Sequence, residues 1–290
     1  MTFRGVSGHA ATADSLGPLR DLSGFWEGTG FSLIARPSSD PANEDGFFLE
    51  LNVLRETIEF TAIASPIFNR GSRQDDIAMY GVTYLHRVTD GTTGGALHIE
   101  PGVWLTIPDT TVPASGPTIA RLSTIPHGNA FCAVGTALEL VPDGPPEIPP
   151  ANTVPFAIGG SPPPAGTKNP YRAYDLTVES PHRTSPLPLS ITQELVDDPN
   201  SLGRQALQGQ TLSHVTHLFA STTSAADLGN IPFINENANT VSLDSVFSVE
   251  RVHGLGDTEF LQLQYSQTAL LEFGGMCFPH VTVGTLVKAF

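Results

Sequence analysis

Polar and apolar residues alternate along most of the chain, and this period of two predicts β-strands. Apolar runs with the period of a helix are nearly absent, while glycine and proline mark turns at short intervals. Strands this close together, without helices between them, favour an all-β fold in which an antiparallel meander closes into a barrel. The expected strands span residues 22–31, 47–54, 57–64, 77–88, 96–107, 118–125, 130–141, 211–222, 242–252 and a pair within 260–290.

Residues 142–210 interrupt this pattern. Thirteen of the chain's 25 prolines lie between Pro142 and Pro188, and proline cannot donate to a strand ladder. We therefore expect a Pro-rich insertion that ends in a short helix after Asp198-Pro199. The resulting organisation is an N-terminal arm with a short helical turn over residues 1–21, followed by a single barrel domain over 22–290 that the insertion divides.

The end of the chain carries the first candidate for chemistry. A turn at Gly274-Gly275 joins the final two strands, and His280 opens the second of them. Thr282 and Gly284, which share its strand face, are small and leave space beside the imidazole. A bound metal or a flat ligand needs such space, so His280 is a candidate metal ligand. The alternative is a hydrogen-bonded structural histidine.

The strand faces opposite the candidate histidines are aliphatic. Val281 and Val283 lie opposite His280, and a similar row lies opposite His98 in the strand 96–107. If the histidines face a cavity, the aliphatic rows point outward and need cover from the insertion or from a partner subunit. A homodimer is one way to supply that cover. The alternative places the aliphatic rows inside the barrel and both histidines outside.

Composition narrows the class of protein. A formal charge of −15 argues against nucleic acid and anionic membranes as partners. No stretch approaches the roughly 20 apolar residues of a membrane helix, and the first residues contain no apolar signal core. Two cysteines are too few for a disulfide framework. Together these features predict a cytoplasmic protein in a reducing compartment.

Three stretches carry a resemblance when they are taken in order. The first is G-F-W-E-G-T-G over residues 24–30, the second is H-I-E-P-G-V-W over 98–104, and the third places Thr285-Leu286 after His280. Together they resemble the nitrobindin-type haem-binding barrels, the family that includes the C-terminal domain of THAP-type proteins. The chain looks like a longer bacterial relative of that family. The resemblance covers about residues 22–141 and 211–290.

The resemblance implies a barrel of about ten strands that holds haem b in its mouth, with His280 on the iron. Family members bind nitric oxide and convert peroxynitrite to nitrate at ferric iron. The resemblance therefore also implies a small-molecule oxidant or a diatomic gas as the partner. One departure lies at residues 32–37, where the family has a short loop over the haem edge. The residues that we expect at the cofactor are His280, Gly28, Gly30, Arg36, Leu97 and Thr282.

Charge and spacing add to these expectations. His98 and Glu100 share a strand face, where the carboxylate can fix the imidazole tautomer or act with it as an acid–base pair. Histidine suits proton transfer because its ordinary pKa is about 6.5, and the resemblance places His98 at the wall of the haem pocket. A structural His–Glu pair is the alternative. Arg36 follows the glycine-rich strand, and we expect it to contact the haem propionates. The alternative is a solvated side chain.

Two other classes of barrel are alternatives to the haem barrel. Lipocalin-like carriers of apolar small molecules also begin with a G-x-W motif, but they are usually secreted, shorter and disulfide-bonded. A cupin-like metal enzyme would need an H-x-H pair on one strand, which this sequence lacks. The C-x-x-C-H motif of c-type haem is also absent. The apolar-ligand carrier is therefore the main alternative.

Overall fold

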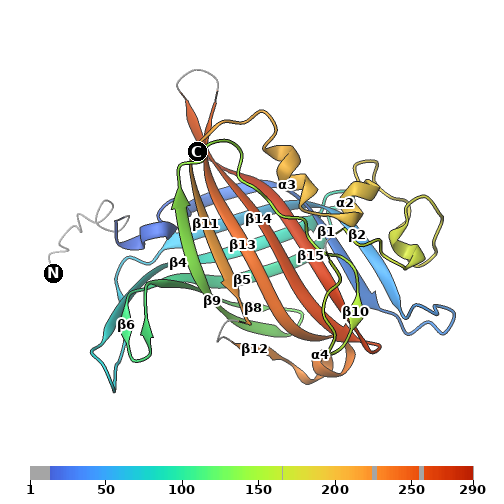
Figure 1. Ribbon diagram of the computed structural model, residues 1–290, viewed down its shortest axis with the longest axis horizontal. Coiled ribbons are helices and arrows are strands. Elements are labelled where there is room, and N and C mark those ends of the chain that lie inside the picture. Colours follow the sequence, from blue (N-terminus) through green and yellow to red (C-terminus); the bar gives the residue numbers. More distant parts are fainter. Residues whose placement is uncertain (1–13, 165, 224–226, 255–257, 290) are drawn as a thin grey trace.

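The computed structural model describes residues 14–164, 166–223, 227–254 and 258–289, and these form a closed antiparallel β-barrel (Figure 1). Residues 1–13 of the expected N-terminal arm lie outside the described residues. Pairing of the last barrel strand with the first closes the barrel. Among the described residues, ten strands follow one another around it: β1 (Gly24–Pro37), β2 (Phe47–Ala62), β4 (Ile77–Asp90), β5 (Ala96–Ile107), β8 (Thr118–Ile125), β9 (Asn129–Leu140), β11 (Leu212–Ser221), β13 (Asn239–His253), β14 (Glu259–Phe273) and β15 (Met276–Lys288).

Shorter elements surround this barrel. The short strands are β3 (Ile67–Asn69), β6 (Thr110–Thr111), β7 (Ala114–Ser115), β10 (Phe156–Ala157) and β12 (Asp227–Asn230). The helical segments are η1 (Gly17–Leu19), η2 (Arg172–Tyr174), α2 (Gln193–Asp197), α3 (Ser201–Ala206) and α4 (Pro232–Asn237). Within the part of the chain that the structure describes, no helix is long and apolar enough to cross a membrane.

Barrel closure depends on a glycine of the opening motif. Gly28 on β1 lies opposite Leu286 on β15. A Cβ atom at Gly28 would lie 2.1 Å from the carbonyl oxygen of Thr285, so no larger residue fits between the two strands. A glycine inside a strand commonly marks such a close approach of two backbones.

Two expectations about strand boundaries were wrong. The predicted strands 47–54 and 57–64 are one continuous strand, β2, because residues 54–57 contain no turn-forming residue and pair with β4 without a break. Residues 32–37 do not form a loop, since β1 continues to Pro37 and pairs with the segment 47–52 of β2. The segment expected to cover the haem edge is therefore part of the barrel wall.

One end of the barrel is filled by apolar side chains. The helical turn at residues 14–19 places Leu16 and Leu19 in the main core, together with Leu22. Trp26 is fully buried there, and its indole N–H donates to the Leu22 carbonyl at 2.6 Å. Trp104 is buried in the same core. This packing closes one end, so any ligand space lies toward the other end.

The Pro-rich insertion lies against the outside of the barrel beside β1, β2 and β15 (Figure 1). Val281 and Val283 of β15 pack there in one cluster with Tyr174 and Val196 of the insertion. This confirms that the aliphatic row opposite His280 points outward and is covered. The insertion does not cover β5 in the same way, because Ile99 remains 40% exposed.

Candidate functional site

A cavity of about 380 Å³ lies inside the barrel, at the end opposite the packed core. This volume is at the low end of the range found for small-molecule sites. Most of its wall is aliphatic, including Ile34, Leu54, Val88, Ile125 and Leu243. Ile234 and Ala238, from α4 and the residue after it, line the same cavity.

Six of the eight residues expected at the site line this cavity: His280, Thr282, Arg36, Leu97, His98 and Glu100. Gly28 and Gly30 do not line it. Their missing side chains instead leave room for neighbouring groups, which are the β15 backbone at Gly28 and the Glu56 carboxylate at Gly30. A role for these two glycines in binding a cofactor stays a prediction.

His280 lies on the cavity wall in β15, as the fifth residue of that strand and not the first. Its Nε2 donates to the carbonyl of Ala35 on the adjacent strand β1, at 2.8 Å. Burial lowers the pKa of His280 to about 4, although the bond to Ala35 opposes this, so the imidazole is neutral at neutral pH. The proton therefore resides on Nε2, and Nδ1 keeps a lone pair. A neutral imidazole with its second nitrogen held by a carbonyl is the usual state of a metal-binding histidine.

Thr282 lines the cavity near His280, but Gly284 does not widen the cavity there. A Cβ atom at Gly284 would lie 2.5 Å from the Tyr265 ring and 2.8 Å from the Glu56 carboxylate. The expectation that Gly284 leaves space beside the imidazole was therefore wrong. The side chains of Tyr265 and Glu56 occupy the space that Gly284 leaves.

Arg36 marks the rim of the cavity. Its Nε lies 2.5 Å from the Glu50 carboxylate, and its guanidinium carbon lies 5.2 Å from the centre of the Phe48 ring. The side chain is 57% exposed. Arg36 is thus placed where a ligand's anionic groups would reach solvent, but Glu50 already neutralises part of its charge.

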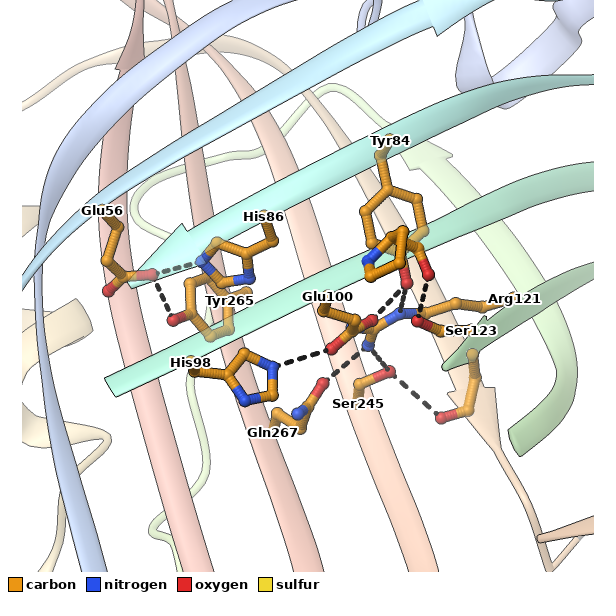
Figure 2. Close-up of polar contacts among 12 residues, drawn as sticks. Glu56, Tyr84, His86, His98, Glu100, Arg121, Ser123, Ser245, Tyr265 and Gln267 are labelled. Atoms are coloured by element: carbon orange, nitrogen blue, oxygen red, sulfur yellow. Dashed lines mark hydrogen bonds and ion pairs between the residues drawn. The ribbon is translucent and has the colours of Figure 1, made fainter. Parts of the chain in front are cut away.

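A fully buried ion pair forms one part of the cavity floor (Figure 2). The Arg121 guanidinium donates to Glu100 at 2.7 Å, and also to the hydroxyl of Tyr84 at 3.0 Å. Tyr84 donates in turn to Glu100. Burial raises the pKa of Glu100, but Arg121 and the bonds from His98 and Tyr84 together lower it well below its usual range. Glu100 therefore stays ionised and can orient His98, but it cannot exchange protons near neutral pH.

His98 lies beside this ion pair. Its Nε2 is 3.4 Å from the second carboxylate oxygen of Glu100, and its side chain is 24% exposed. The ring of His127, in the turn between β8 and β9, stacks on it at 5.9 Å between ring centres. Burial, and to a lesser degree His98, lower the pKa of His127. His127 also lines the cavity.

A second carboxylate–histidine pair was not anticipated from the sequence. Glu56 of β2 accepts a hydrogen bond from Tyr265 of β14 at 2.5 Å, and the same oxygen lies 2.7 Å from Nε2 of His86 in β4 (Figure 2). The other oxygen of Glu56 is buried without a hydrogen-bond partner, beside Gly30 and Gly284. His86 and Tyr265 line the cavity.

A sequence signal for this pair exists, although it is weak. Glu56 lies between Leu54 and Ile58 on one strand face, and His86 lies between Tyr84 and Val88 on another. A polar residue in the inward register of an apolar face must find a partner inside the barrel. The alternation therefore marks each residue alone, but it does not show that the two meet.

The comparisons with known proteins assign the chain to no family. No family model matches the chain, and no curated protein matches it. Among solved structures, it is similar to Rv2717c from M. tuberculosis at 15% sequence identity and a TM-score of 0.44, over 96% of this chain and 98% of that chain. This likeness carries no argument about function. Within the described ranges, no three His, Cys, Asp or Glu side chains come together as a metal site of their own.

Proposed function

We propose that the protein binds haem b in the barrel cavity, with His280 as the protein ligand to the iron. The observation that supports this most is the hydrogen bond from His280 Nε2 to the Ala35 carbonyl, on the wall of an apolar cavity. That bond fixes the tautomer and leaves Nδ1 as the nitrogen that can bind a metal. The low pKa of His280 keeps this nitrogen unprotonated at neutral pH.

The lining of the cavity suits an apolar ligand with one polar edge. Aliphatic side chains cover most of the wall, while Arg36 lies at the rim, where propionates would meet solvent. His98 is on β5, four strands away from β15 around the barrel, so it lies on a different side of the cavity from His280. If haem were held by His280, His98 would be the proton-handling histidine on the other side of the cavity.

When bound, haem iron with one histidine ligand offers an open position for a diatomic gas or a small peroxidic oxidant. We propose that peroxynitrite, converted to nitrate, is the oxidant. In this chain the proton-handling group near that position is His98, and Glu100 is its positioning residue because it stays ionised. Replacing His98 with Leu should retain haem and slow the decay of the oxidant by roughly 10²–10⁴, the usual contribution of a general acid–base group.

The test of haem binding is an absorption spectrum of the purified protein after addition of haem. Wild type and His217→Ala should show the same sharp Soret band, whereas His280→Ala should show only the spectrum of free haem. His217 is a matched control because it is half-buried, its Nδ1 lies 2.8 Å from the Ser248 hydroxyl, and it does not line the cavity. An unchanged Soret band in His280→Ala would exclude His280 as the ligand.

A second candidate is a carrier of an apolar small molecule without redox chemistry. The modest cavity volume and its aliphatic wall favour it. A fluorescent apolar dye would distinguish the two functions. The carrier function predicts saturable dye binding that added haem does not displace, whereas the haem function predicts that one equivalent of haem displaces the dye completely.

A further inference from the structure

Two imidazole groups lie beside each other at the bottom of the cavity, and each is held by its own buried carboxylate (Figure 2). His86 Nε2 lies 2.7 Å from Glu56, and His98 Nε2 lies 3.4 Å from Glu100. The centres of the two rings are 6.3 Å apart. Both rings line the same cavity, so one small molecule can reach both of them.

The hydrogen bonds decide which nitrogens remain for a ligand. Burial, and then the nearby Glu56 charge, raise the pKa of Tyr265 well above its usual value, so the phenol keeps its proton and donates to Glu56. The same carboxylate oxygen therefore accepts from Nε2–H of His86, and Nδ1 of His86 is left over. Glu100 is ionised and accepts from Nε2–H of His98, which leaves Nδ1 of His98 in the same way.

A third polar group completes the floor. The Gln267 side chain accepts a hydrogen bond from Arg121 through its Oε1, at 2.7 Å. Arg121 thereby fixes the amide plane, and among the described residues no protein group accepts from the Gln267 Nε2. Gln267 lines the cavity. It therefore offers an oriented N–H donor to a ligand oxygen.

We propose that this floor is a proton-transfer site for a small, apolar, enolisable carbonyl compound. Gln267 binds the carbonyl oxygen, His86 removes a proton from the carbon beside the carbonyl, and His98 returns a proton from the solvent to that carbon. This activity goes beyond haem binding and does not require it. Gln267 and Tyr265 lie deeper in the barrel than Ala269, which is the β14 partner of His280.

The reaction balances without any oxidant or further reactant. The C–H bond breaks, its proton goes to Nδ1 of His86, and its electron pair forms a carbon–carbon double bond. The carbonyl electrons move onto the oxygen, where the Gln267 N–H stabilises the charge. His98, which has taken up a proton from the solvent at Nδ1, then gives this proton to the same carbon, and the carbonyl re-forms. Exchange of protons with water returns both imidazoles to their starting states.

The two carboxylates make the imidazoles unequal. Glu100 is already paired with Arg121, whereas no Arg or Lys pairs with Glu56 among the described residues. A proton taken up by His86 is therefore balanced by the full charge of Glu56. This assigns His86 as the base and His98 as the acid, with Glu56 and Glu100 as positioning residues.

The experiment follows exchange of the methylene protons of 2-indanone, a flat apolar ketone, in deuterated buffer by proton NMR. The full-length wild-type protein should accelerate loss of the methylene signal above the rate in buffer alone. His86→Gln and His98→Gln should each slow the exchange by roughly 10²–10⁴, and Gln267→Leu should raise the ketone concentration needed for half-maximal rate. The control His217→Gln should match wild type.

Exchange at the buffer rate with wild-type protein would overturn the proposal, and so would an equal rate in wild type and His98→Gln. His98 is part-exposed, so its substitution tests the site even if His86→Gln fails to fold. Glu56→Gln should also change the pH profile of exchange. If Glu56 were purely structural, this substitution would leave the pH profile unchanged. Haem uptake by the same preparations tests the His280 proposal separately, because these variants leave His280 in place.

Discussion

Glu250 should weaken the folded state as the pH rises. It lies on β13 between Gln262 of β14 and Val215 of β11, and it is fully buried although it belongs to the outer face of the barrel. Gln262 donates to one carboxylate oxygen at 2.7 Å, and the other oxygen has no hydrogen-bond partner. Burial raises the pKa of Glu250 from 4.5 to about 7, and the single bond from Gln262 opposes this only in part.

The sign and size of the effect follow from linkage. Because the folded chain holds the Glu250 proton more tightly than the unfolded chain, stability is highest below about pH 4.5 and falls as pH rises to about 7. At 1.36 kcal/mol per pKa unit, a rise from 4.5 to about 7 corresponds to about 3 kcal/mol lost above pH 7. Glu250→Gln carries no charge, so the variant should exceed wild type in stability by about that amount near pH 8 and by little near pH 4.5.

The contribution of His280 to the free energy of unfolding changes with pH in the opposite direction. Its folded pKa of about 4 lies below its ordinary value of 6.5, so its contribution to stability is lost as pH falls from 6.5 to about 4. The two contributions therefore oppose each other between about pH 4.5 and 6.5. The difference between wild type and Glu250→Gln removes the His280 contribution, because both proteins share it.

The assay is urea unfolding followed by tryptophan fluorescence, since Trp26 and Trp104 are both fully buried. Free energies of unfolding are compared near pH 4.5 and near pH 8. Glu59→Gln serves as the control, because it makes the same substitution at an exposed position of a barrel strand. If Glu250→Gln differs from wild type by the same amount at both pH values, the carboxylate ionises normally and the reasoning fails.

Three further predictions concern the barrel itself. Glu100→Gln should cost about 3–5 kcal/mol in urea unfolding, because it leaves the buried charge of Arg121 unpaired; a cost below 1 kcal/mol would show that water reaches the pair. Gly28→Ala should cost about 1–3 kcal/mol or more through its clash with Thr285, whereas the open position at Gly229 should tolerate alanine, and equal costs would contradict the closure argument. Deleting residues 145–188 should cause aggregation, seen by light scattering, because it uncovers the outer apolar cluster on β1, β2 and β15, while the haem spectrum should persist; a soluble deletion protein that has lost haem would place the insertion at the site.

The sequence was sufficient for the barrel because inward and outward positions alternate in nearly every strand. The Gly274-Gly275 turn, the β8–β9 hairpin and the outward direction of Val281 were all predictable from local pattern. The continuity of β2 was not, because the charged pair Arg55-Glu56 interrupts the apolar pattern although the strand continues through it. Both predicted halves pair with β1 without a shift in register, and this pairing shows that they are one strand.

Only part of the candidate site was predictable from the sequence. His98 and Glu100 were identified because they are two residues apart on one strand. Glu56, His86 and Tyr265 come from three strands, with 30 residues between the first two and 209 between Glu56 and Tyr265. No local pattern can report such contacts. They exist because closure of the barrel brings β14 and β2 to neighbouring sides of one interior.

The most direct test of haem binding through His280 is a titration of the full-length protein with haem, followed at the Soret maximum. For wild type, the absorbance should rise linearly and break at one haem per chain, whereas His280→Ala should give a gradual curve without a break. A wild-type titration without a break, or a break at the same ratio in both proteins, would contradict haem binding through His280.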